Sequence, residues 1–182
     1  MNETKTYSTS ELLNIMGGLE LRMQQYYQKV AEKFPQPNDI RVFWDSLAQQ
    51  ESIHATIIST LTNMFRNNPE MFSNIVEVDY STILKMEKFI LTSMEKLENT
   101  DFTLDDALNE AFELETLEIN EIYDRIIESP KEPFRAVIDH LIESEEAHLN
   151  SLIEAIMKYS SKDSLKEKAQ NLKSAVLISS QV

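Results

Sequence analysis

Glutamate and histidine residues recur in this chain at a spacing that suits metal binding. Glu51 is followed three residues later by His54, and 94 residues further along Glu145 is followed in the same way by His148. Residues i and i+3 share one face of a helix, so each pair can direct a carboxylate and an imidazole toward one point. Mixed carboxylate and imidazole ligands suit first-row transition metals. The two pairs predict a buried dinuclear metal site.

Each pair interrupts an apolar stripe with helical spacing. The first stripe contains Ile40, Trp44, Leu47, Glu51, His54, Ile58, Leu61 and Phe65. The second, displaced by 94 residues, contains Phe134, Ile138, Leu141, Glu145, His148, Leu152, Ala155 and Tyr159. Steps of three and four residues are typical of one face of an amphipathic helix. The sequence therefore predicts two equivalent helices whose inward faces carry the metal ligands.

Two further helices are expected to supply more carboxylates. Glu20 lies in an apolar stripe over residues 13–34, and Glu115 occupies the equivalent position 95 residues later. Glu118 adds a carboxylate where the first copy has Met23. Five carboxylates buried together would repel one another and lose hydration. We expect two divalent cations to balance them, with the imidazoles as neutral ligands. The alternative is a helical bundle that no longer binds metal.

The composition predicts an all-α protein. Only two glycines and five prolines occur in 182 residues, 42% of which are hydrophobic, and no segment alternates as a strand would. The absence of cysteine excludes disulfides, thiolate catalysis and iron–sulfur or rubredoxin-type sites in this chain. The net charge of −14 argues against nucleic acid and anionic membranes as partners. Without a signal-like or membrane-spanning segment, we expect a cytoplasmic protein.

The predicted helices form two hairpins joined by a long crossover. Their expected ranges are 10–34, 40–65, 104–128 and 133–159. Asn38 is the expected N-cap of the second helix. The crossover, residues 66–103, is expected to carry its own helix, and a short fifth helix should follow residue 160. We expect one antiparallel four-helix bundle over residues 1–160, with residues 161–182 as an extension that docks on the bundle or at a dimer contact.

The ligand pattern resembles that of the rubrerythrin branch of the ferritin-like di-iron proteins. That branch has E-x-x-H in its second and fourth helices, matched here by ESIH and EEAH, and E-x-x-E in its third, matched by Glu115 and Glu118. A tyrosine follows the first-helix and third-helix ligands by two turns, as Tyr27 and Tyr123 do here. The resemblance implies a ferritin-like bundle. It covers the four helices and leaves the C-terminal extension unmatched.

The resemblance also implies a ligand set and roles within it. The metal ligands would be Glu20, Glu51, His54, Glu115, Glu118, Glu145 and His148. Two iron ions joined by an oxo or hydroxo bridge are implied, and manganese is an alternative. Glu20, Glu51 and Glu145 would be terminal or chelating ligands. Glu115, with groups on the Glu145 side, would help to bridge, and His148 would bind one iron. His54 and Glu118 would exchange at one iron as its oxidation state changes. Tyr27 and Tyr123 would hold carboxylates by hydrogen bonds, although core packing explains them nearly as well.

From this family we expect a non-haem di-iron oxidoreductase that reduces hydrogen peroxide or dioxygen. Because no rubredoxin domain is present, the electrons would come from a separate donor protein, and we expect a homodimer. Two other functions use the same ligands. One is iron handling, in which ferrous ion is oxidised and passed on, and the other is a dimanganese site with catalase activity.

Overall fold

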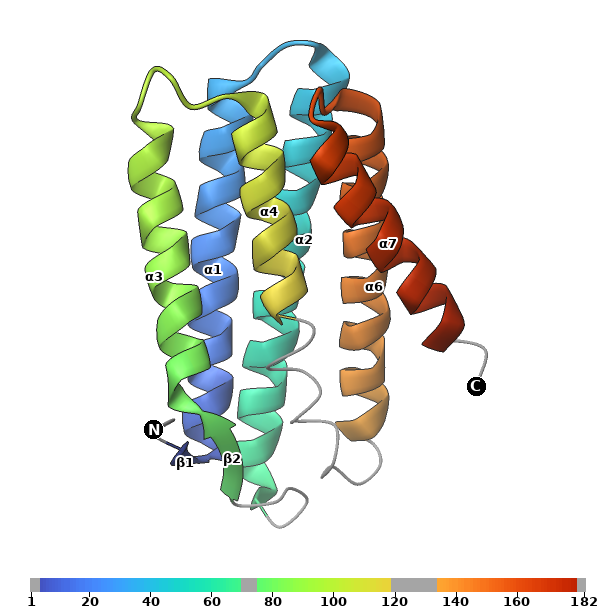
Figure 1. Ribbon diagram of the computed structural model, residues 1–182. Helices are drawn as coiled ribbons and strands as arrows, with labels where there is room; N and C mark the ends of the chain where they lie inside the picture. Colours follow the sequence, from blue (N-terminus) through green and yellow to red (C-terminus); the bar gives the residue numbers. More distant parts are fainter. Residues whose placement is uncertain (1–3, 70–74, 119–133, 180–182) are drawn as a thin grey trace.

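Among the residues that the structure describes, four helices form the bundle and two more lie against its outside (Figure 1). The computed structural model describes residues 4–69, 75–118 and 134–179. The bundle helices are α1 (Thr9–Lys33), α2 (Asn38–Asn67), α4 (Leu104–Glu118) and α6 (Phe134–Tyr159). Helix α3 (Tyr80–Leu97) packs on α1 and α4, and α7 (Asp163–Ser179) packs on α6. All six agree with the expected order of helices, and the predicted extension of α4 to residue 128 lies outside the described residues.

The helix boundaries have local causes. Thr103 and Asp106 form a capping box at the start of α4, in which the Thr103 hydroxyl accepts from the Asp106 N–H at 3.2 Å and the Asp106 carboxylate accepts from the Thr103 N–H at 3.0 Å. Asn38 was expected to cap α2, and this was wrong. Pro37 is the N-cap, with extended backbone angles, and Asn38 is the first helical residue. Proline's fixed φ suits that boundary without a side-chain hydrogen bond.

The apolar stripes form the core of the bundle, as their spacing predicted. In α2, the buried residues include Ile40, Trp44, Leu47, Ile58 and Leu61, each at most 1% exposed. Phe65, at the end of the stripe, is partly buried. The described members of the α6 stripe follow the same pattern. This burial orients the polar members of each stripe toward the centre of the bundle.

A short two-stranded sheet was not expected from the sequence. Strand β1 (Thr4–Ser8) pairs antiparallel with β2 (Ile75–Asp79), with Thr4 opposite Asp79 and Ser8 opposite Ile75. β1 leads into α1, and β2 leads into α3. The β-branched residues of β2 favour a strand, but the pairing joins segments far apart in the chain. This pair of five-residue strands is a small addition to the helices, and the predicted all-α fold is confirmed.

The crossover and the C-terminal segment both dock on the bundle. Arg22 of α1 pairs with Glu87 of α3 at 2.8 Å, which holds the crossover helix beside α1. On the other side, Leu165 and Ala169 of α7 are buried at 2% and 0% exposure. The division at residue 160 stays a prediction, but α7 does pack on α6. Within the described part of the chain, no helix has the length and hydropathy needed to cross a membrane.

Candidate metal centre

Five of the predicted ligands come together in the middle of the bundle. Glu20 comes from α1, Glu51 and His54 from α2, Glu115 from α4 and His148 from α6, and all five have 0% exposure. Each of these residues lies on a stripe that faces the bundle axis, and distances of 3.5–3.6 Å between their side chains place them at one level. Each bundle helix therefore contributes at least one ligand-type side chain.

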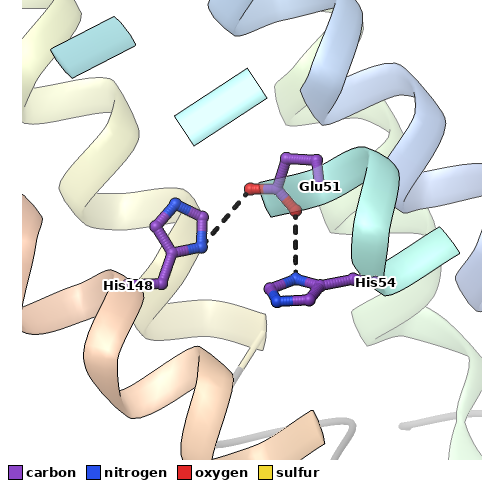
Figure 2. A group of neighbouring side chains, drawn as sticks. All are labelled: Glu51, His54 and His148. Atoms are coloured by element: carbon purple, nitrogen blue, oxygen red, sulfur yellow. Dashed lines mark ion pairs between the residues drawn. The ribbon is translucent and has the colours of Figure 1, made fainter. Parts of the chain in front are cut away.

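Glu51 lies between the two imidazoles (Figure 2). Its Oε2 atom is 3.5 Å from Nδ1 of His54, and its Oε1 atom is 3.6 Å from Nδ1 of His148. The three residues offer ligand atoms that all lie within 4.8 Å of one another. Each carboxylate oxygen of Glu51 therefore faces a different imidazole.

Glu20 and Glu115 flank this central group. Oε2 of Glu20 is 3.6 Å from Nδ1 of His54, and Oε2 of Glu115 is 3.5 Å from Nδ1 of His148. Each imidazole nitrogen therefore faces one outer carboxylate and one oxygen of Glu51. The result is two similar half-sites that share Glu51.

Tyr27 holds the outer carboxylate of one half-site. Its hydroxyl donates a short hydrogen bond to Oε1 of Glu115, which leaves Oε2 of that carboxylate facing His148. Burial, with the nearby Glu115 and Glu51 carboxylates, raises the pKa of Tyr27 well above its ordinary value. The phenol therefore stays protonated and keeps its donor. The ring also stacks on Trp44 with centroids 5.9 Å apart, which fixes its orientation.

Ser144 positions the imidazole of the other half-site. Its hydroxyl lies 2.8 Å from Nε2 of His54, while Nδ1 of that ring faces Glu20 and Glu51. A partner on one ring nitrogen sets the orientation and tautomer of a metal-binding histidine. Ser144 was not expected at the site from the sequence. The one signal for it is its position four residues before His148, on the same side of α6.

The surroundings of His148 favour its neutral form. Burial, followed by the proximity of His54, lowers the pKa of His148 from 6.5 to about 3. A neutral imidazole is the form that binds a metal ion. The carboxylates of Glu20, Glu51 and Glu115 are fully buried beside these rings, where an ionised carboxylate requires a compensating charge. Three carboxylates and two imidazoles fit a pair of divalent transition-metal ions.

The remaining predicted residues cannot be placed at the side-chain level. Glu118 is the last residue of α4 and Glu145 lies within α6, but their side chains are outside what the structure describes, and Tyr123 lies outside the described residues altogether. The role of all seven residues as metal ligands stays a prediction. Glu51 faces both imidazoles, and which carboxylate bridges the metal ions stays a prediction.

Comparison with known proteins agrees with the helical fold. The family model described as Rubrerythrin matches residues 11–156. The fold is similar to the crystal structure of a protein from Thermotoga maritima described as a ferritin-like diiron-carboxylate protein. The two share 18% sequence identity with a TM-score of 0.61, over 87% of this chain and 100% of that one. A search of curated proteins found no match. The structural similarity supports the ferritin-like bundle, and the family match covers all four of its helices.

Proposed function

The chain belongs to the rubrerythrin family, and from this we propose that it is a di-iron oxidoreductase that reduces hydrogen peroxide or dioxygen with electrons from an external donor. The observation that carries the proposal is the placement of Glu51 between His54 and His148, with a further carboxylate beside each imidazole. Residues placed this way would hold two metal ions with one carboxylate shared between them, and the ions would supply redox chemistry toward a small oxidant.

Within this proposal the ligands divide between two positions. Glu20 and His54 would hold one ion, Glu115 and His148 would hold the other, and Glu51 would bridge them. Glu118 and Glu145 would complete the coordination. Two ferrous ions would supply the two electrons that convert one hydrogen peroxide and two protons to two waters. Carboxylate and imidazole ligands also bind manganese, so the experiment must determine which metal the protein retains.

The surrounding residues keep this geometry fixed. Tyr27 directs one oxygen of Glu115 away from the centre, so the other points toward His148. Ser144 holds His54 with Nδ1 toward the carboxylates. Such support commonly changes metal affinity or activity ten- to a hundredfold. The apolar core around the site excludes bulk water, so that only small molecules would reach the ligands.

The proposal is tested by loading the full chain anaerobically and mixing it with oxidant. We expect close to two irons per chain by elemental analysis. Stopped-flow absorbance should then show the diferrous protein oxidised by peroxide faster than by dioxygen, and much faster than free ferrous ion. The Glu51→Gln variant is the test of the bridge, and Glu154→Gln on the exposed face of α6 is the matched control.

Two results would contradict the proposal. Oxidation by peroxide at the rate of free ferrous ion would exclude a peroxide-reducing centre. Continued oxidation of many irons per chain would instead indicate iron handling. Loading with equal ferrous and manganous ion distinguishes the metals, since retention of two manganese ions and no iron would redirect the assignment to a catalase-like site.

A further inference from the structure

A further buried polar cluster lies outside the metal centre, where α3 packs against both α1 and α4 (Figure 1). The Tyr26 hydroxyl of α1 donates to Oε2 of Glu110 on α4 at 3.3 Å. The other oxygen of Glu110 accepts from the Lys96 ammonium of α3 at 2.6 Å. Tyr26 has 0% exposure and Glu110 has 5%, whereas Lys96 is half exposed. Apolar residues of similar size would pack here at a lower desolvation cost, so these polar groups require an explanation.

Tyr26 is joined to the metal centre by its neighbour in the chain. The rings of Tyr26 and Tyr27 have centroids 5.4 Å apart, within the range of an aromatic contact. Tyr27 in turn donates to Glu115 and presents its ring to the imidazole of His148, with centroids 6.2 Å apart. The aromatic contacts therefore run from a predicted metal ligand to Tyr26. Such a path suits an electron, which can pass between rings in contact, whereas a proton needs a chain of hydrogen bonds.

Glu110 gives Tyr26 the proton acceptor that its oxidation requires. A phenol that loses an electron becomes a strong acid, so its one-electron oxidation is favoured where a base can take the proton. The Glu110 carboxylate lies within hydrogen-bond reach for that transfer. Burial, followed by the charge of Glu110 and the hydrogen bond to it, raises the pKa of Tyr26 well above its ordinary value. The phenol is therefore protonated at neutral pH, and its electron and proton must leave together.

Trp44 also contacts Tyr27 but lacks a proton acceptor. Its indole stacks on the Tyr27 ring with centroids 5.9 Å apart. The side chain is fully buried, and within the described part of the chain its Nε1 atom has no hydrogen-bond partner. An oxidised indole would therefore have no group in place to receive its proton. Of these two neighbours of Tyr27, Tyr26 is the one equipped for reversible oxidation.

The far end of the cluster opens on the surface. A pocket of about 380 Å³ has a lining that includes Glu110 and Lys96 together with Asn99, Phe102 and Asn109. A small reductant in this pocket would lie beside Glu110, which is one hydrogen bond away from Tyr26. The five placed ligands of the metal centre are themselves fully buried. An electron from outside must therefore cross protein to reach them, and the tyrosine pair lies on such a route.

We propose that Tyr26 is a one-electron relay residue for the metal centre, with Glu110 as its proton acceptor and the α3–α4 pocket as the entry point for a one-electron reductant. The relay rests on the proposed peroxide reduction and deepens it. A one-electron donor refills a two-electron centre in two steps, so a centre with a single ferrous ion must arise. That half-reduced centre is one electron short of what hydrogen peroxide requires, and Tyr26 supplies the missing electron.

The electrons and protons of this step balance. One hydrogen peroxide takes one electron from the remaining ferrous ion, which becomes ferric, and one electron from Tyr26 through Tyr27. With two protons from solvent, the O–O bond breaks and two waters form. Tyr26 becomes a neutral phenoxyl radical, and its proton passes to the Glu110 carboxylate. A one-electron reductant at the pocket then restores the phenol, because the proton on Glu110 returns to the phenoxyl oxygen together with the electron.

Freeze-quench electron paramagnetic resonance of the full chain tests the relay. Iron-loaded protein is treated anaerobically with one equivalent of ferricyanide, which removes one electron per centre, and is then mixed with hydrogen peroxide. We expect the signal of a tyrosyl radical, which should narrow when the protein is grown on ring-deuterated tyrosine. Tyr26→Phe should abolish this signal yet still bind close to two irons, because the lost hydroxyl lies against Glu110. Glu110→Gln should slow radical formation about a hundredfold.

Two further variants serve as the control and as the test of the pocket. Tyr159→Phe makes the same chemical change at a half-buried tyrosine beside Lys158 at the end of α6, and should leave the signal unchanged. Ascorbate is the probe reductant. It should remove the radical about tenfold more slowly in Asn109→Trp than in the native chain, because the indole occupies the pocket and holds the reductant further from Tyr26.

Several results would overturn the relay. One is the absence of a radical in half-oxidised native protein that still consumes peroxide. Others are a radical that persists in Tyr26→Phe and a radical that is lost in Tyr159→Phe. Equal removal of the radical by ascorbate in Asn109→Trp would overturn the assignment of the pocket. Failure of the proposed function is seen separately, as slow oxidation of the diferrous protein by peroxide before ferricyanide is added, and it would remove the oxidant on which the relay depends.

Discussion

Replacement of Glu51 by glutamine should stabilise the metal-free protein and remove its stabilisation by metal. Glu51 is fully buried and faces His54 and His148. Burial lowers the pKa of His148 to about 3, so that ring supplies no positive charge at neutral pH. In the absence of metal, the carboxylate therefore carries a large desolvation penalty. Glutamine has nearly the same shape without the charge.

The size of the effect follows from the burial of the charge. Desolvation costs several kcal/mol per buried ion, and neutral replacements of buried charged groups have gained about 1–4 kcal/mol. We expect a gain of about 2 kcal/mol, which corresponds to a rise of about 4–8 °C in the Tm of a protein of this size. Conversely, ferrous ion at a hundred times its dissociation constant should stabilise the native protein by about 2.7 kcal/mol. The Glu51→Gln variant should lack most of this stabilisation by ferrous ion.

Anaerobic thermal unfolding of both proteins, with chelator and with ferrous ion, measures the two effects together. Glu154→Gln on the exposed face of α6 controls for the loss of one surface charge and should change stability by less than about 0.5 kcal/mol. The reasoning is refuted if the metal-free Glu51→Gln protein melts below the metal-free native protein. It is also refuted if ferrous ion raises both melting temperatures equally.

Three further perturbations probe the surroundings of the centre. Tyr27→Phe removes the hydrogen bond to Glu115 and should weaken metal binding about ten- to a hundredfold in a competition titration, with unchanged helix content by circular dichroism. The depressed pKa of His148 means that only the unfolded chain binds a proton between pH 6.5 and about 3, so stability should fall as the pH drops through this range. Metal-free protein should lose about 2 kcal/mol from this group between pH 7 and 5 in urea unfolding, and His148→Gln should show a correspondingly smaller loss. Lys96→Met removes the ammonium group that lies 2.6 Å from the nearly buried carboxylate of Glu110. The protein should be destabilised by only about 1 kcal/mol, because Lys96 is half exposed and solvent weakens the ion pair. An unchanged urea midpoint would contradict this.

The local features of this protein follow from its sequence. Steps of three and four residues identify α2 and its inward face, so the burial of Glu51 and His54 on that face is predictable from residue spacing alone. Repetition of the pattern near His148 identifies α6 as its equivalent. The motif in these helices also indicates the rubrerythrin family, which the family match confirms. Such inferences succeed because helical periodicity and burial depend mainly on neighbouring residues.

The tertiary structure determined how groups on different helices meet. Contacts between helices depend on how each helix is rotated and shifted along its axis. Examples are the approach of Glu51 to His148, the contact of Ser144 with His54 and the hydrogen bond from Tyr27 to Glu115. Small shifts of that kind leave the stripe pattern unchanged, so the sequence alone does not specify which carboxylate faces both imidazoles. The β1–β2 pair was missed for a related reason, since it joins segments separated by the whole of α1 and α2. Residue spacing within a helix is a local property, whereas these contacts depend on the packing of the entire chain.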